Sequence, residues 1–172
     1  MSTTATVELR DEVPTDVIAI RALTQAAFLD APHRSGTEQF IIDALRREGA
    51  LSASVVALRD GVIVGHAAAS PVTIDDHDWG WRGLGPVSVI PDFQDQGIGR
   101  LVVDAVLSRL RTQDAAGCVV LGDPAYYGRF GFRPLPQLRL PGVPCEYFQS
   151  LPFSEGVPQG DVAYSQAVDA TA

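Results

Sequence analysis

The chain has 172 residues, of which 46% are hydrophobic and 20% charged, and its net charge is −8. This composition suits one soluble globular domain over residues 1–172, large enough to bury a core. The negative charge argues against nucleic acid and against an anionic membrane surface as partners, because both repel an acidic protein. All 13 basic residues are arginines, which excludes a P-loop lysine, a pyridoxal phosphate Schiff base and a kinase-type lysine.

The cysteine content indicates the compartment. Two cysteines, Cys118 and Cys145, are too few for a disulfide framework and fit a reducing environment. The first ten residues are polar and lack the apolar segment of a secretory signal, and no apolar run is long enough to span a bilayer. We therefore expect a cytoplasmic protein.

The hydrophobic pattern predicts the elements in chain order. We expect strands at residues 6–10, 51–58, 62–70, 79–90, 117–121, 146–153 and 162–168, and helices after Pro14, from Thr37 to Gly49, at residues 97–111 and briefly at 124–129. Asp60-Gly61 is a strong hairpin signal, and the wholly apolar run 117–121 is typical of a buried parallel strand. This order predicts an α/β (α+β) fold around one mixed, mostly antiparallel sheet with a helical crossover in its middle.

A glycine-containing turn precedes the clearest helix. The segment Gln94-Asp95-Gln96-Gly97-Ile98-Gly99-Arg100 lets the backbone approach a ligand closely. The first amides of a helix lack intrahelical partners and carry the positive end of its dipole, so the turn can bind a phosphate or pyrophosphate. Its spacing fits a plain strand-to-helix turn equally well. It is not a dinucleotide fingerprint, because Val102 stands where the third glycine is required.

The pattern Gln-x-x-Gly-x-Gly in this turn resembles the acetyl-CoA pyrophosphate loop of the GCN5-related N-acetyltransferase (GNAT) superfamily. Residues 84–89 are similar to the family strand that precedes the loop. Residues 121–132, with Asp-Pro-Ala-Tyr-Tyr-Gly-Arg-Phe-Gly-Phe, are similar to the segment that closes the site, especially in the YhbS-like branch of single-domain bacterial members. The resemblance covers about residues 6–168 and implies about seven strands flanked by about four helices.

The resemblance also implies acetyl-CoA as cosubstrate. The implied cofactor-binding residues are Val87, Ser88, Val89, Gln94, Asp95, Gln96, Gly97, Ile98, Gly99, Arg100 and Tyr126. The strand residues among them would dock the pantetheine arm through their backbone, beside a β-bulge that the neighbouring glycines and Pro86 make reasonable. Arg100 and Arg129 could pair with the phosphates.

Tyr127 stands four residues before Gly131, as in the family's Tyr-x-x-x-Gly-Phe. A phenol with a pKa of about 10 is protonated at neutral pH and can donate to a thiolate leaving group. We expect Tyr127 to be the general acid, although the adjacent Tyr126 could instead face the sulfur. The chain lacks the upstream asparagine of the commoner family pattern, and Asp123 is expected to cap the short helix.

The general base is open to three interpretations. Glu38 lies in the second helix, whose start borders the acceptor site in this family, and it is the first candidate. His66 is the second, although a lone histidine in a strand is more often structural. A chain of waters that carries the proton to bulk solvent is the third.

The two cysteines suggest a rival route through an acetyl-cysteine intermediate. We rank it low, because Cys118 lies in an apolar strand and Cys145 has no evident base partner. No Cys/His spacing predicts zinc, and the acidic turn near residue 75 lacks a calcium-loop pattern, so no metal is expected. Trp79 and Trp81 are expected to share one strand face.

The main hypothesis is an N-acetyltransferase that moves the acetyl group of acetyl-CoA directly to a primary amine, on a small molecule or peptide, in a ternary complex. One alternative is a non-catalytic acyl-CoA-binding or regulatory domain. A weaker one is an acyltransferase for a longer acyl group. Exposed sheet edges make a homodimer a reasonable expectation.

Overall fold

The computed structural model describes residues 6–29 and 36–169. The strands are β1 (Val7–Asp11), β2 (Ala53–Arg59), β3 (Val62–Ile74), β4 (Trp81–Val89), β5 (Gly117–Leu121), β6 (Leu138–Arg139), β7 (Phe148–Pro152) and β8 (Gly160–Tyr164). The α-helices are α1 (Val17–Phe28), α2 (Glu38–Arg47), α3 (Ile98–Thr112) and α4 (Pro124–Tyr127). Up to α4, the elements follow the order that the hydrophobic pattern predicts.

The strands form one mixed sheet, as expected. Its main path is β1-β2-β3-β4-β5-β7, while β8 pairs with β3 and β6 pairs with β8. Among the described strands only the β4–β5 and β6–β8 pairs are parallel, and α3 supplies the crossover that the β4–β5 pair needs. The sheet has eight strands rather than about seven, because β6 has only two residues and leaves no pattern in the sequence.

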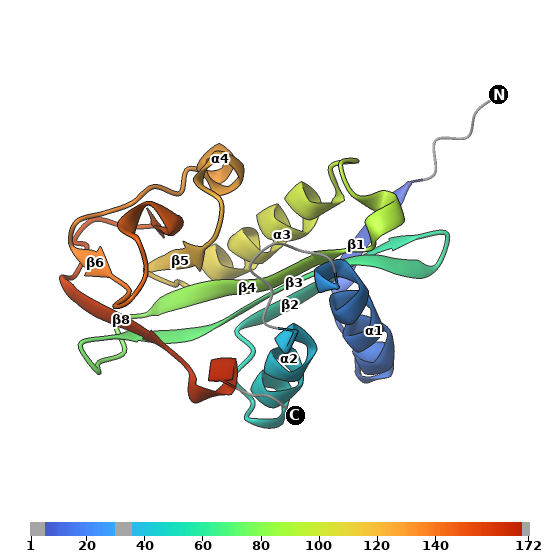
Figure 1. The fold of residues 1–172 in the computed structure, drawn as a ribbon, viewed down its shortest axis with the longest axis horizontal. Helices are drawn as coiled ribbons and strands as arrows, with labels where there is room; N and C mark the ends of the chain where they lie inside the picture. The colour runs from blue at the N-terminus through green and yellow to red at the C-terminus, as the bar shows by residue number, and fades with distance from the viewer. Residues whose placement is uncertain (1–5, 30–35, 170–172) are drawn as a thin grey trace.

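Helices cover both faces of the sheet. In Figure 1, α3 lies on one face and α1 and α2 lie on the other, and we call these the α3 face and the α1/α2 face. The core of the α3 face includes Val55, Ala57, Ala67, Ala69, Leu84, Val102, Val106, Leu110, Cys118 and Val120. These residues alternate along the strands and recur at helical spacing along α3, so the amphipathic pattern of the sequence is buried here.

The α1/α2 face carries two separate clusters. Beneath the two helices lie Ile20, Ile42, Val56, Leu58 and Ala68. Toward the end of the sheet that carries β6 and β8 lie Val72, Ile74, Trp81, Val119, Leu138, Phe148 and Val162. Residues opposite each other on neighbouring strands share a face, so these clusters identify which side chains point away from α3.

Three sequence-based expectations about strands are wrong in detail. Trp79 precedes β4 and is 54% exposed, whereas Trp81 is buried in the core, so the two tryptophans do not share a strand face. The strand expected at residues 162–168 ends at Tyr164 and is followed by a 3-10 turn, because its ladder with β3 stops there. The strand expected at residues 146–153 begins at Phe148, after another 3-10 turn.

Strand β4 separates from β5 halfway along its length. The parallel pairing runs from Trp81 opposite Gly117 to Leu84 opposite Val120, and it stops there. Strand β4 nevertheless continues to Val89. Residues 85–89 therefore have an edge that no described strand covers, which we call the open edge of β4.

A β-bulge lies at the same point of β4. Ala67 of β3 is opposite Val87, while Ala69, two residues further on, is opposite Leu84. Strand β4 therefore has one residue more than β3 around Gly85-Pro86. The bulge expected in this strand is confirmed.

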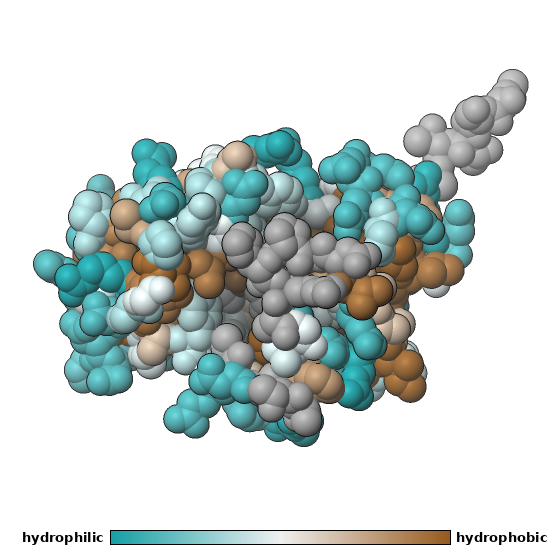
Figure 2. Space-filling view, viewed as in Figure 1, coloured by the Kyte–Doolittle hydropathy of each residue, from teal (hydrophilic) through white to brown (hydrophobic). Residues whose placement is uncertain are grey.

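The surface shows where apolar side chains remain exposed. In Figure 2, hydrophobic residues gather over α1, whose Ile18 is 83% exposed. None of the helices in the described ranges has the length and apolar character needed to cross a membrane. The exposed apolar surface of α1 thus belongs to a helix whose opposite side packs on the sheet.

Candidate active site

A cleft of about 620 Å³ lies beside the open edge of β4. Its walls come from the end of α1, from β4, from the turn before α3 and from α4. The lining residues are Ala27, Phe28, Val87, Val89, Phe93, Gln94, Asp95, Gly97, Gly99, Arg100, Tyr126, Tyr127 and Arg129. The structure therefore brings most of the predicted cofactor-binding residues and the predicted general acid to one cavity.

The first turn of α3 presents backbone amides to this cleft. Gly97 precedes the helix with a φ of +82°, a left-handed conformation that glycine adopts without strain. No side chain caps the helix, and no described residue accepts a hydrogen bond from the amides of Gly97, Ile98, Gly99 or Arg100. Because these amides carry the positive end of the helix dipole, the turn can bind an anion.

Two glutamine side chains hold the turn in shape. Gln94 Nε2 donates to the carbonyl oxygen of Val89 at 3.0 Å, and Gln96 Nε2 donates to that of Asp92 at 3.3 Å. Gln96 Oε1 in turn accepts a hydrogen bond of 3.0 Å from Arg59 of β2. The side chains thus tie the turn to the sheet and leave its amides for a ligand.

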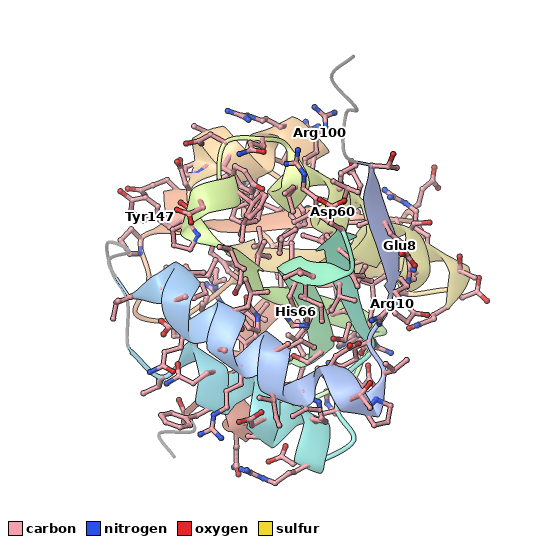
Figure 3. All side chains as sticks on the ribbon, turned by 90° about the vertical axis from the view of Figure 1, so that its right-hand side faces the viewer. Glu8, Arg10, Asp60, His66, Arg100 and Tyr147 are labelled. Atoms are coloured by element: carbon pink, nitrogen blue, oxygen red, sulfur yellow. The ribbon has the colours of Figure 1, made fainter. Side chains whose placement is uncertain are left out.

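Two arginines bring positive charge to the cleft. The Arg100 side chain is 66% exposed, lies at the surface in Figure 3, and is 3.7 Å from the carboxylate of Asp104. The guanidinium of Arg129 lies 5.8 Å from the centre of the Tyr126 ring. Both arginines line the cleft, where their charge suits phosphate groups.

The open edge of β4 offers backbone groups as well. The amide of Ile90 donates to the carbonyl of Val64 at 2.9 Å, so Ile90 faces β3. The backbone N–H and C=O groups of successive strand residues point to opposite sides. Those of Ser88 therefore also point to β3, while those of Val87 and Val89 point to the cleft. The amide and carbonyl of Val87 are therefore positioned to pair with an extended ligand.

Tyr126 and Tyr127 form the wall that α4 contributes. The Tyr126 hydroxyl rests on the first turn of α3, where a Cβ at Gly99 would lie 2.6 Å from it. The ring of Tyr127 packs over Gly122, where a Cβ would collide with it, and against the core of the α3 face. The two tyrosine rings pack edge to face, with their centres 4.9 Å apart. Glycine at positions 99 and 122 therefore makes room for both rings.

Burial determines the protonation of both phenols. Desolvation raises the pKa of Tyr127 far above its ordinary value, and the neighbouring Tyr126 and Cys118 raise it further. Desolvation also raises the pKa of Tyr126, while Arg129 opposes the shift. Both hydroxyls therefore carry their proton at physiological pH, and Tyr127 can act as a hydrogen-bond and proton donor.

Helix α4 begins with a side-chain cap. Asp123 Oδ1 accepts a hydrogen bond of 2.9 Å from the amide of Ala125, and Pro124 follows at the first helical position. Asp123 does not line the cleft. The capping role predicted for it is confirmed.

Four predicted site residues lie outside the lining of the cleft. Ser88 and Ile98 are buried, Ser88 opposite His66 on the α1/α2 face and Ile98 in the core of the α3 face. Gln96 is exposed and bonded within the turn. Glu38 is the first residue of α2 and is half-buried. Ile98 and Gln96 can therefore meet a ligand in the cleft only through their backbone. The backbone of Ser88 points to β3 and its side chain is buried, so the structure directs neither to the cleft. The assignment of Glu38 stays a prediction.

His66 is fully buried on the α1/α2 face, and Figure 3 places it inside the molecule beside α1. Its Nε2 lies 2.8 Å from Ser54 Oγ. Burial lowers its pKa to about 3, assisted by Arg46 and opposed by Asp16. A neutral imidazole that does not reach the cleft favours the structural interpretation over the role of general base.

Neither cysteine belongs to the cleft. Cys118 is buried in the core of the α3 face, and burial raises its pKa to about 12. Cys145 is exposed and lines a separate apolar pocket of about 720 Å³ under residues 134–148. No group of three or more His, Cys, Asp or Glu side chains in the described part of the chain could hold a metal ion.

Three lining residues were missed by sequence reasoning. Ala27 and Phe28 end α1, and Phe93 precedes the glycine turn. Each has an apolar side chain that the hydrophobic pattern treats as ordinary core. Ala27 and Phe28 reach the cleft through the packing of α1 against the sheet, which no local signal reveals.

Comparison with known proteins agrees with this geometry. The sequence model of the Acetyltransferase (GNAT) family matches residues 17–132. The uncharacterized N-acetyltransferase YhbS of Escherichia coli (strain K12) is 37% identical over 125 residues, which cover 72% of each chain.

Two solved structures are similar along almost the whole chain. A GNAT family acetyltransferase from Brucella melitensis, in complex with acetyl-CoA, has a TM-score of 0.86 and 45% identity, covering 96% of this chain and 99% of that one. Escherichia coli YhbS, in complex with CoA, has a TM-score of 0.89 and 31% identity, covering 100% and 97%.

The open mixed sheet, the parting of β4 from β5 and the glycine turn at α3 define an acetyltransferase fold. The chain belongs to the GNAT family of acetyltransferases and is similar to YhbS. The resemblance inferred from the Gln-x-x-Gly-x-Gly and Tyr-Tyr segments is confirmed.

Proposed function

We propose that the protein is an N-acetyltransferase that moves the acetyl group of acetyl-CoA directly to a primary amine, on a small molecule or peptide, within a ternary complex. The observation that carries the proposal is the row of amides from Gly97 to Arg100 that have no acceptor among the described residues, set beside the open edge of β4 and the Tyr127 phenol. The acetyl-CoA and CoA bound to the two solved relatives support the same ligand for this cleft.

Each part of the cosubstrate has a matching set of groups in the cleft. The amides of the α3 turn would bind the pyrophosphate, and Arg100 and Arg129 would add charge around it. The pantetheine arm would lie along the open edge of β4 and pair with the backbone of Val87. Because Val87 and Tyr127 line the same cleft, an arm bound along this edge would bring the thioester to Tyr127.

The transfer needs a donor for the developing oxygen charge and a proton for the departing thiolate. A backbone amide on the open edge of β4 would serve as the first donor. As the new N–C bond forms and the C–S bond breaks, the Tyr127 hydroxyl would give its proton to the sulfur. Alignment of both substrates in one cleft supplies much of the acceleration.

The proton lost by the amine needs a route out. Glu38 at the start of α2 is the proposed base, and a water chain to bulk solvent is the alternative. A Glu38→Gln variant distinguishes them: a strong loss of kcat supports Glu38, while an unchanged kcat supports the water route.

Direct transfer is favoured over an acetyl-cysteine route. The thiol of Cys118 is buried and its pKa is raised to about 12, so it is neither accessible nor ionised. Cys145 lies in the other pocket. A Cys145→Ser variant should therefore keep full transferase activity.

Isothermal titration with acetyl-CoA is the first test, followed by a thiol-release assay with a panel of primary amines. Absence of binding at high micromolar acetyl-CoA would contradict the proposal at its foundation. Binding without transfer to any amine would support a non-catalytic acyl-CoA-binding domain instead. Faster turnover of a longer acyl-CoA would change the acyl group but keep the mechanism.

We further propose that the chain works in the cytoplasm as one domain over residues 1–172, with its core at about 6–168. The two free thiols support a reducing compartment. The main path of the sheet ends at β1 and β7, and pairing at either edge would produce a homodimer. Sedimentation velocity tests that state.

A further inference from the structure

Tyr164 carries a buried hydroxyl that the proposed mechanism does not use. It is the last residue of β8, and its side chain packs against the core of the α1/α2 face. No described residue forms a hydrogen bond with its hydroxyl, which solvent does not reach. Such a group is destabilising unless a partner is supplied, so it points to a ligand.

The ring of Tyr164 rests directly on β4. A Cβ at Gly83 would collide with its Cε1 atom and would lie 3.0 Å from its Cδ1 atom. The hydroxyl end of the ring is therefore the end nearer to Gly83. Gly83 stands one residue before Leu84, where the pairing of β4 with β5 stops. The hydroxyl consequently lies beside the point where the two strands separate.

Tyr164 and Tyr127 approach this point from opposite faces of the sheet. Tyr127 packs against the core of the α3 face, and Tyr164 packs against that of the α1/α2 face. Their proximity has an electrostatic consequence: burial raises the pKa of Tyr164, and Cys118 and Tyr127 raise it further. The Tyr164 hydroxyl is therefore neutral and can both accept and donate a hydrogen bond.

A second unpartnered hydroxyl lies in the same row of the sheet. Gly83 is opposite Val119, and Val119 is opposite Ser150, so the three residues share the α1/α2 face. Ser150 Oγ is buried and has no hydrogen-bond partner among the described residues. This face thus carries three buried hydroxyls without a partner among the described residues, those of Tyr164 on β8, Ser150 on β7 and Ser88 on β4.

The position of the cosubstrate limits the direction from which the amine can approach. A cosubstrate held by the α3 turn and the open edge of β4 would lie on the α3 face of the sheet where β4 and β5 separate, which is the face that Tyr127 occupies. An amine that attacks the thioester must reach its carbonyl carbon from a side that the cosubstrate leaves open. The α1/α2 face is the other side of the sheet at this point, and the Tyr164 side chain packs on that face.

We propose, on the basis of the N-acetyltransferase function proposed above, that Tyr164 is an acceptor-binding residue. Its hydroxyl oxygen accepts a hydrogen bond from the N–H of a neutral primary amine and turns the nitrogen lone pair toward the thioester. An uncharged hydroxyl at a buried position selects the neutral amine, which is the nucleophilic form.

Tyr164→Phe tests the inference, because it removes only the hydroxyl and keeps the ring on Gly83. The probe is whichever of tyramine, spermidine, glycinamide and an alanyl dipeptide the wild-type protein acetylates fastest. We expect the KM for this amine to rise roughly tenfold. The KM for acetyl-CoA and the Kd for CoA should stay unchanged, and the Tm should not fall, because the variant removes a buried hydroxyl that has no partner among the described residues. Tyr147→Phe makes the same chemical change at an exposed tyrosine and should alter none of them.

A second variant changes Gly83, the residue of β4 that the Tyr164 ring contacts. Gly83→Ala adds a methyl group that pushes the Tyr164 ring off β4, so the amine KM should rise selectively there too. CoA titration checks that each variant is folded.

The possible outcomes separate this inference from the function on which it rests. An unchanged amine KM in Tyr164→Phe, or an equal rise for amine and acetyl-CoA, overturns the acceptor-binding role and leaves the transferase intact. Wild-type protein that binds acetyl-CoA but acetylates none of the probes overturns the proposed function and this inference together.

Discussion

Two helices contribute residues to the cleft, and they begin in opposite ways. Helix α4 is capped: Asp123 accepts a hydrogen bond from Ala125, and Pro124 removes another amide that would need a partner. Helix α3 starts after the left-handed Gly97 with no side-chain cap, and its first amides have no acceptor among the described residues.

The contrast separates a helix start that is stabilised by a cap from one whose amides are available to the ligand proposed above. A cap contributes about 1 kcal/mol to stability, so leaving the long α3 uncapped forgoes that stabilisation. The cap of the short α4 stabilises the helix that carries Tyr126 and Tyr127. The protein therefore caps the helix that carries the proposed proton donor and leaves amides without an acceptor among the described residues on the helix proposed to bind an anion.

Charge at the open helix start would give the largest effect. Gly97→Glu places a carboxylate where a diphosphate is proposed to bind, and like charges at such a distance cost several kcal/mol. We expect acetyl-CoA affinity to fall roughly a thousandfold in isothermal titration. Gly97→Ala is the matched control, since its methyl group meets no atom within 4 Å and adds only backbone strain. Equal losses in both variants would show that conformation, rather than charge, matters.

Removal of the proposed proton donor on the capped helix comes next. Tyr127→Phe keeps the ring over Gly122 but cannot protonate the thiolate, so kcat should fall roughly a hundredfold. The Kd for CoA should change little. Because burial raises the pKa of Tyr127 well above 10, its ionisation should not limit the rate up to pH 9. Normal turnover of Tyr127→Phe, measured by thiol release, would transfer the role to Tyr126.

The third prediction concerns a polar group in the interior, the buried side chain of His66, and its effect on stability. The pKa of His66 is about 3 in the folded protein against 6.5 in the unfolded chain. Between these values the unfolded chain binds a proton that the folded protein does not, so stability falls as the pH is lowered. The loss should reach about 2 kcal/mol at pH 5.

Urea unfolding at pH 7 and pH 5 measures this loss. His66→Gln should remove this part of the pH dependence, because glutamine does not titrate. His77→Gln, at an exposed position, should retain it. An identical pH dependence in both variants would assign the acid sensitivity to other groups.

The cap of α4 should give the smallest effect. Asp123→Ala leaves the Ala125 amide without its partner and should lower the free energy of unfolding by about 1 kcal/mol. Asp123→Asn keeps a capping oxygen and should lose much less. A large drop in kcat without a change in stability would mean that Asp123 takes part in the chemistry.

Features encoded within a few residues could be predicted from the sequence. Helix α3, the glycine turn, the Asp123 cap and the bulge at Gly85-Pro86 each rest on neighbouring side chains or backbone preferences, and each is present. The cleft could be predicted in part for the same reason, since the turn and the Tyr-Tyr pair are local motifs.

Features that depend on distant contacts could not be predicted. Phe28 reaches the cleft only because α1 crosses the sheet there, and Tyr164 reaches Gly83 only because β8 pairs with the far end of β3. Strand β6 exists only as a two-residue partner of β8. In each case the deciding partner is more than fifty residues away or leaves no periodic pattern.

The Tyr126 hydroxyl of α4 contacts Gly99 of α3, and this contact connects the two helices across the cleft. A side chain from α4 already touches the opening turn of α3, so the width of the groove is preset before any cosubstrate arrives. Ligand binding then requires little rearrangement of either wall, which favours rapid association. A methyl group added at position 99 would push the Tyr126 hydroxyl away from α3. The cleft would then be wider, and we expect it to bind the pantetheine arm less tightly.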